Sequence, residues 1–136
     1  MNDLTEIFGA PISTYTRADA LADGFLIDIS TVAREAGITF PTAITAAAWA
    51  DCVAWDKSDN ARKGTVNDEA GRLWDVVWML KCAIGRSSGG SILNYSLLRV
   101  PREGRGRQPR LTSLKSICGP GDTAAPVITI MLPHED

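Results

Sequence analysis

Residues 68–84 read DEAGRLWDVVWMLKCAI, and apolar residues recur in this stretch every three or four positions. The spacing places four of them on one stripe of a helix: Leu73, Val77, Leu80 and Ile84. Trp74 and Trp78 lie one turn apart beside that stripe. Acidic residues near the start and basic residues near the end suit the helix dipole. We therefore predict a long helix over residues 68–84 that packs through its apolar stripe.

Three strands are predicted to follow this helix. They cover residues 92–100, 111–118 and 127–132. Two of them have apolar residues at alternate positions, which is the period of a strand with one buried face. These residues are Leu93, Tyr95 and Leu97 in the first strand, and Ile128, Ile130 and Leu132 in the third. We expect an antiparallel meander whose apolar face packs against helices.

A second tryptophan-bearing helix is predicted over residues 42–55. Pro41 suits the first turn of a helix, and the alanines at 46–48 are good helix formers. Residues 56–67 lose the helical period and are rich in polar residues, so they are predicted to be an exposed loop.

The segment before residue 42 is predicted to form short elements. These are a helix that Thr16 caps and Gly24 ends, a strand over residues 25–29, and a short helix from about Ser30 to Gly37.

The composition is that of an ordinary globular domain, with 45% hydrophobic and 22% charged residues among 136. We predict one α+β domain over residues 1–136, in which short helix and strand elements precede two longer tryptophan-bearing helices packed on a three-stranded antiparallel meander. The apolar runs are far shorter than the roughly 20 residues of a membrane span. The first residues also lack the basic and apolar regions of a signal peptide. We expect a cytoplasmic protein that does not contact a membrane.

No catalytic or cofactor motif is recognisable. The glycine-rich segment 85–91 follows a helix and lacks the Gly-Lys-Ser/Thr of a phosphate-binding loop. The one histidine, His134, lies among the last three residues, which disfavours histidine-dependent nucleophilic catalysis. The cysteines at 52, 82 and 118 are isolated, so neither a zinc site nor a disulfide framework is expected. We predict no cofactor and no metal.

Asp51 and Asp75 are the carboxylates of most interest, because each lies inside a predicted tryptophan-bearing helix. Burial can raise the pKa of such a group and make it a general acid or base. The alternative is an exposed or salt-bridged helix residue, since structural ion pairs are commoner than catalytic ones. The sequence leaves open whether the two share a pocket.

The connection between the first two predicted strands of the meander is rich in arginine. It contains Arg99, Arg102, Arg105, Arg107 and Arg110, interspersed with proline and glycine. These guanidinium groups suit contacts with phosphates or with an acidic protein surface. The alternative is a solvated loop. No aromatic residue is interleaved with the arginines, so a platform for stacking single-stranded bases is not expected.

The charge is unevenly distributed along the chain. The net charge is −2, made up of −5 over residues 1–68 and +3 over residues 69–136. This asymmetry indicates two electrostatically distinct faces, but not a strongly basic nucleic-acid binder. The tryptophans, at 49, 55, 74 and 78, are predicted to be core residues from their helical spacing. An interface anchor is the alternative role for one of them.

The chain resembles a family of small proteins of unknown function encoded in bacterial genomes and on plasmids and phages. The resemblance extends over nearly the whole chain. The matching segments are Ile7-Phe8-Gly9-x-Pro11-Ile12, Tyr15-Thr16-Arg17-Ala18-x-Ala20-Leu21-x-Asp23-Gly24, Trp49-Ala50-Asp51-Cys52-Val53, Gly71-Arg72-Leu73-Trp74-Asp75-Val76, and Cys118-Gly119-Pro120-Gly121-Asp122 leading to Pro126-Val127-Ile128-Thr129-Ile130-Met131-Leu132-Pro133. The resemblance implies an accessory role in a mobile genetic element and supplies no catalytic residues.

Three functional hypotheses follow. The first is a non-enzymatic protein that binds a protein complex, such as an inhibitor of a host defence complex of the CRISPR type, through the arginine-rich hairpin and the acidic N-terminal half. The second is nucleic-acid binding through the same arginines. The third is an enzyme with a carboxylate-centred pocket around Asp51 and Asp75. The oligomeric state is left open.

Overall fold

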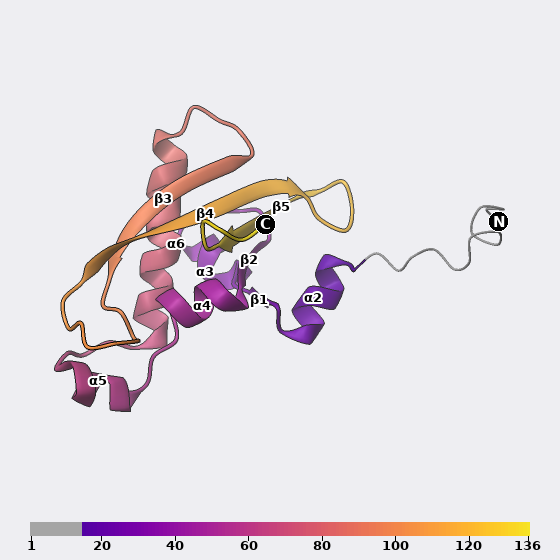
Figure 1. The fold of residues 1–136 in the computed structure, drawn as a ribbon. Helices are drawn as coiled ribbons and strands as arrows, with labels where there is room; N and C mark the ends of the chain where they lie inside the picture. Colours follow the sequence, from indigo (N-terminus) through magenta and orange to yellow (C-terminus); the bar gives the residue numbers. More distant parts are fainter. Residues whose placement is uncertain (1–14) are drawn as a thin grey trace.

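The computed structural model describes residues 15–136, which form five helices and a five-stranded sheet (Figure 1). In chain order the elements are α2 (Arg17–Asp23), β1 (Leu26–Asp28), α3 (Ser30–Glu35), β2 (Thr42–Thr45), α4 (Ala46–Cys52), α5 (Lys57–Lys63), α6 (Glu69–Arg86), β3 (Ile92–Arg99), β4 (Arg110–Pro120) and β5 (Pro126–Met131). The predicted α+β class is confirmed. Within the described part of the chain, no helix has the length and apolar character needed to span a membrane.

The strand order in the sheet is β1-β2-β5-β4-β3. The last three strands pair antiparallel in sequence order, so the predicted C-terminal meander is confirmed. β2 adds to it by parallel pairing with β5, and β1 pairs antiparallel with β2. The sheet is therefore mixed, and it is two strands wider than the predicted meander.

The predicted helix over residues 42–55 is wrong in its first turn. Residues 42–45 form β2, and only seven residues after them form the helix α4. β-Branched side chains favour a strand at Thr42, Ile44 and Thr45, and pairing with β5 supplies the partners. Thr45 then caps α4, because its Oγ1 accepts a hydrogen bond from the Ala48 amide at 3.1 Å. The second long tryptophan-bearing helix is thus a strand followed by a short helix.

The predicted loop over residues 56–67 contains the helix α5. Asp56 and Asp59 form a capping box, in which each side chain accepts a hydrogen bond from the other residue's backbone amide, at 3.1 and 2.9 Å. Gly64 ends the helix with a φ of 66°, a conformation that favours glycine. The segment is therefore a short polar helix with well-defined ends, in which Asp59 and Lys63 are buried.

The core lies between the sheet and the inner face of α6. That face contains buried side chains only: Leu73, Val76, Val77, Leu80 and Ala83. It packs across β3, where the Tyr95 hydroxyl donates a hydrogen bond to the Val76 carbonyl at 3.1 Å. Helices α3 and α4 contact both α6 and β2 and complete this layer. The predicted packing of the meander on the long helix is confirmed.

Helix α2 reaches the sheet from the opposite side. The Arg17 guanidinium donates to Thr129 Oγ1 at 2.6 Å, and strand alternation points Thr129 away from the core residues Ile128 and Ile130. The first amides of α2 also donate to the Asp122 carboxylate, which lies in the turn between β4 and β5. Elsewhere on this side, the paired residues Leu98 and Leu111 are exposed.

Candidate functional site

The arginine-rich connection runs from Arg99, the last residue of β3, through a loop beside α5 to Arg110, the first residue of β4 (Figure 1). Two of its arginines are used within the protein. Arg99 Nη2 lies 3.1 Å from each carboxylate oxygen of Asp51. Arg102 donates to Asp59 at 2.8 Å and to Asp56 at 3.3 Å. The other three side chains are exposed to solvent: Arg105, Arg107 and Arg110.

Asp59 is the centre of the contact between α5 and this loop. Its residue is only 3% exposed, and its carboxylate accepts hydrogen bonds from Arg62 at 2.7 Å and from Arg102. Desolvation alone would raise the pKa of Asp59, but the hydrogen bond from Arg62 and the other donors, Arg102 among them, outweigh it and lower the pKa to about 2. Pairs of this kind join the acidic half of the sequence to the basic half, so part of the charge asymmetry is neutralised by folding.

Asp51 and Asp75 lie near the same pair of arginines, Arg72 and Arg99. Asp75 lines a hollow of about 200 Å³ together with these two arginines. Asp51 is not among the lining residues and contacts the hollow through its ion pair with Arg99. Burial raises the pKa of Asp75, and the positive charge of Arg72 partly offsets that effect. Asp51 is paired with Arg99, whereas none of the ion pairs found within residues 15–136 includes Asp75, and the two carboxylates do not line the hollow together.

The four tryptophans differ in burial, and Trp49 is partly buried and packs against the core. Trp55 is buried, as predicted, and the Arg72 guanidinium lies 4.4 Å from its ring centroid. Trp74 and Trp78 are 37% and 44% exposed, so the prediction that they belong to the core is wrong. Their rings stack on the outer face of α6, with centroids 5.8 Å apart and planes 14° apart. A stacked aromatic pair is thereby presented to solvent.

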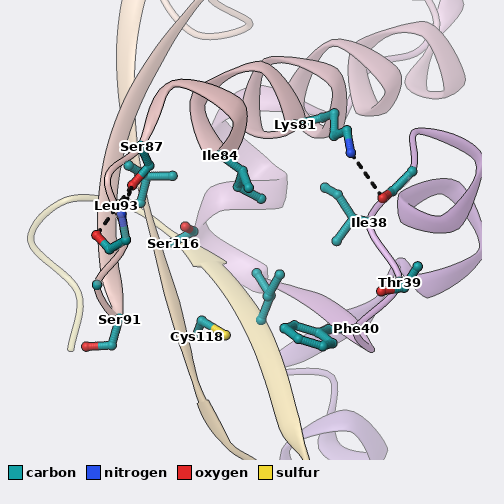
Figure 2. A pocket seen from close by; sticks show the side chains of 14 residues that line it. Ile38, Thr39, Phe40, Lys81, Ile84, Ser87, Ser91, Leu93, Ser116 and Cys118 are labelled. Carbon is teal, nitrogen blue, oxygen red and sulfur yellow. Dashed lines mark hydrogen bonds between the residues drawn. The ribbon is translucent and has the colours of Figure 1, made fainter.

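A hollow of about 310 Å³ lies beside the C-terminal half of α6 (Figure 2). Figure 2 shows side chains from α6, from the segment before β2 and from the sheet arranged around it. Its apolar lining includes Ile38, Phe40, Ile84, Leu93 and Ile128. Its one cationic side chain is Lys81. The Lys81 Nζ donates a hydrogen bond of 3.3 Å to the Gly37 carbonyl, which is drawn at the upper right of Figure 2.

The aromatic pair does not line the hollow, but Trp78 is a neighbour of the lining residue Lys81 on α6. Trp78, Lys81 and Ile84 follow one another at three-residue spacing on α6, which makes them neighbours on the helix. Phe40, 42% exposed, closes the other side of the hollow. We call Trp74, Trp78, Lys81, Ile84 and Phe40, with the hollow between the last three, the α6 surface.

The hollow of the α6 surface presents hydroxyl, thiol and ammonium groups beside its apolar walls. Hydroxyl and thiol groups line the hollow at Ser87, Ser91, Ser116 and Cys118. Its one ionisable basic group is Lys81, and the residues that line the hollow include neither histidine nor carboxylate. The sequence did not single out Phe40 or Lys81. In the sequence, Phe40 is marked only as a large aromatic residue beside Pro41, and Lys81 only as a basic residue three positions after Trp78.

A family model describes the whole chain: the model of DUF6573 matches residues 1–136. The chain belongs to DUF6573, a family of unknown function. No curated protein and no solved structure matches it. Membership of DUF6573 attaches no activity to the α6 surface or to the arginine-rich loop, so their roles are inferred from their geometry.

Proposed function

We propose that this protein is a non-enzymatic binding protein that docks onto a protein complex through the α6 surface. The observation that supports this most strongly is the stacked, solvent-facing pair Trp74 and Trp78. Tryptophan is enriched in the energetic centres of protein interfaces, where a large rigid side chain is desolvated by the partner. Two adjacent, partly exposed tryptophans are available to a partner at this surface.

The hollow specifies the chemistry of the docked segment. Its walls at Phe40 and Ile84 are apolar, while Lys81 retains hydrogen-bonding capacity beyond its contact with the Gly37 carbonyl. A partner would therefore insert an apolar side chain into the hollow and place a carboxylate against Lys81. The tryptophan pair would cover an adjacent apolar patch of the partner.

The biological setting of this proposal comes from the resemblance to proteins of bacterial genomes, plasmids and phages. An accessory protein of a mobile genetic element benefits from inhibiting host defence by occupying a surface of a defence complex. A CRISPR effector is one such complex. Inhibition by binding needs no catalytic residues, which agrees with the binding character of the α6 surface.

The α6 surface is a better candidate for protein docking than the arginine-rich hairpin. Arg99 and Arg102 are committed to Asp51, Asp56 and Asp59. A partner that recruited these two arginines would have to break ion pairs that position α4, α5 and the loop. Trp74 and Trp78 are exposed, and a partner can contact them without breaking an ion pair.

The test is affinity capture from a bacterial host lysate with three forms of the protein. We expect wild type to retain a specific protein complex and the double variant Trp74→Ala/Trp78→Ala to lose it, because the anchors are removed. Leu98→Ala/Leu111→Ala is the matched control, since it removes two exposed apolar side chains from the open side of the sheet. We expect this control to retain the complex.

Equal capture by the tryptophan variant and the control would overturn the proposal. Light scattering across a concentration series provides a second decision. A wild-type dimer that the tryptophan variant abolishes would assign the α6 surface to a second copy of this chain and contradict docking onto a different protein.

A further inference from the structure

Helix α5 and the loop between β3 and β4 enclose a hollow of about 340 Å³ that shares no lining residue with the α6 surface. It is lined by Arg62, Lys63, Gly104, Arg105 and Arg107. Every charged side chain in this lining is cationic. We call this hollow the α5 cleft.

Lys63 is an unusual component of the cleft, because its residue is only 2% exposed. Its ammonium donates to three loop carbonyls, those of Glu103 at 3.4 Å, Gly104 at 2.9 Å and Gly106 at 2.6 Å. None of the ion pairs found within residues 15–136 includes Lys63. Desolvation and the neighbouring charge of Arg62 lower its pKa, and the carboxylates of Asp59 and Glu103 offset only part of the cost of keeping the charge there. A nearby anion would offset that cost.

The loop is held in a defined position by α5. Arg62 donates to the Gly104 carbonyl at 3.3 Å and to the Arg102 carbonyl at 2.7 Å, in addition to its ion pair with Asp59. Gly104 has a φ of 73°, a conformation that side chains disfavour. Arg62 and Lys63 thus hold the backbone carbonyls of Gly104 and Gly106, which flank Arg105. A loop that is already ordered loses less conformational entropy when it binds a ligand.

Arg105 and Arg107 supply the accessible donors of the cleft. Both residues are exposed, and neither takes part in the ion pairs formed within the described part of the chain. Arg107 Nη1 lies 4.0 Å from the position that a Cβ on Gly64 would occupy, so this guanidinium lies against the end of α5. Two unpaired guanidinium groups therefore border a buried ammonium.

We propose that the α5 cleft binds a phosphate group. Two guanidinium groups can donate several charge-assisted hydrogen bonds to phosphate oxygens, and the positive charge of Lys63 and Arg62 adds long-range attraction. No aromatic side chain lines the cleft, so the phosphate and not an attached base is recognised. This role is independent of protein docking on the α6 surface.

The phosphate has two possible sources, a nucleic-acid backbone or a small phosphorylated compound. Three probes separate them: inorganic phosphate, adenosine monophosphate, and a short fluorescently labelled single-stranded DNA. Binding of the first two is followed by calorimetry at low ionic strength, and binding of the DNA by fluorescence anisotropy over a salt series. Tighter binding of the DNA, with affinity that falls steeply with salt, assigns the cleft to nucleic acid. Binding of phosphate or the nucleotide at least as tight as that of DNA assigns it to small compounds.

Arg105→Ala/Arg107→Ala is the decisive variant. We expect it to weaken binding of the best probe by roughly tenfold for each guanidinium group removed. Arg34→Ala/Arg86→Ala is the matched control, because both arginines are exposed, lie outside the cleft and give the same change in net charge. Circular dichroism of each variant confirms that the fold is kept. Failure of all three probes to bind wild type, or equal weakening by the two double variants, overturns the proposal.

Discussion

The inner and outer faces of α6 are both apolar, yet only the inner face is buried within the domain. Val76, Val77 and Leu80 on the inner face are completely buried against the sheet and its companion helices. Trp74 and Trp78 on the outer face stack on each other in solvent. A helix that is apolar on both sides usually has a neighbour on both sides. The inner face stabilises the fold, and the outer face belongs to the surface that we propose docks onto a partner.

A substitution on the inner face of α6 should cause the largest loss of stability. Leu80→Ala removes a completely buried side chain and leaves a cavity between α6 and the sheet. We expect the free energy of unfolding to fall by about 3 kcal/mol, as measured by urea denaturation. A loss below about 1 kcal/mol would show that the inner face is not the main packing surface.

A polar residue at the edge of the inner face should give the next largest effect. Arg72 is 5% exposed and donates to the Val53 carbonyl at 3.2 Å and to the Val100 carbonyl at 3.0 Å. Arg72→Met keeps most of the side-chain volume but leaves both carbonyls without this donor. We expect a loss of about 2 kcal/mol in the free energy of unfolding. Unchanged stability in the same urea measurement would mean that water replaces the guanidinium at no cost.

The outer face should contribute little to stability. Trp74→Ala/Trp78→Ala removes two side chains that are 37% and 44% exposed, so we expect the free energy of unfolding to fall by about 1 kcal/mol, less than for Leu80→Ala. Thermal unfolding followed by circular dichroism measures this directly. A loss as large as that of Leu80→Ala would assign the tryptophans to the core and remove the distinction between the faces.

Asp75, between the two faces, should give the smallest effect and a characteristic pH dependence. Its pKa is raised in the folded protein, so the folded state holds its proton to higher pH than the unfolded state does. Its ionisation therefore costs stability above its folded pKa, and this cost disappears as the pH falls below its unfolded pKa, near 4. We expect Asp75→Asn to stabilise the protein by a few tenths of a kcal/mol at neutral pH, because solvent screens the group.

The prediction for Asp75 is checked by measuring the free energy of unfolding of both proteins as a function of pH. The stability curves of wild type and Asp75→Asn should converge below pH 4 and separate as the pH rises. Curves that separate in the opposite direction would show that Asp75 gains a stabilising partner on ionisation.

The long helix and the meander could be predicted because their signals are local. Apolar residues recur about every 3.6 positions over residues 68–84 and at every second position in β3 and β5. These spacings are sufficient to predict the helix and the strands. β2 was missed because its stabilising pairing is with β5, more than 80 residues later, while Pro41 and three following alanines favour a helix locally. The signal for α5 was present as the capping box Asp56 and Asp59, but the polar composition obscured it.

The candidate sites were less predictable than the fold. Helical spacing shows that Trp74 and Trp78 share one face of the helix. It does not show which face is buried, because the stripe of Leu73, Val77 and Leu80 is apolar as well. The pairing of Arg102 with Asp59 joins residues more than 40 positions apart, so the sequence could not tell a paired arginine from the exposed Arg105 and Arg107. The position of Lys63 beneath the loop has no sequence signal that we recognise.

The claim that the outer face of α6 is the docking surface is tested most directly by hydroxyl-radical footprinting of the free protein and of the complex captured from lysate. Trp55, buried in both, is the internal reference. We predict that oxidation of Trp74 and Trp78 slows markedly in the complex, because the partner covers their rings, while the rate at Trp55 stays unchanged. Equal oxidation rates of Trp74 and Trp78 in the free and bound protein would contradict the account.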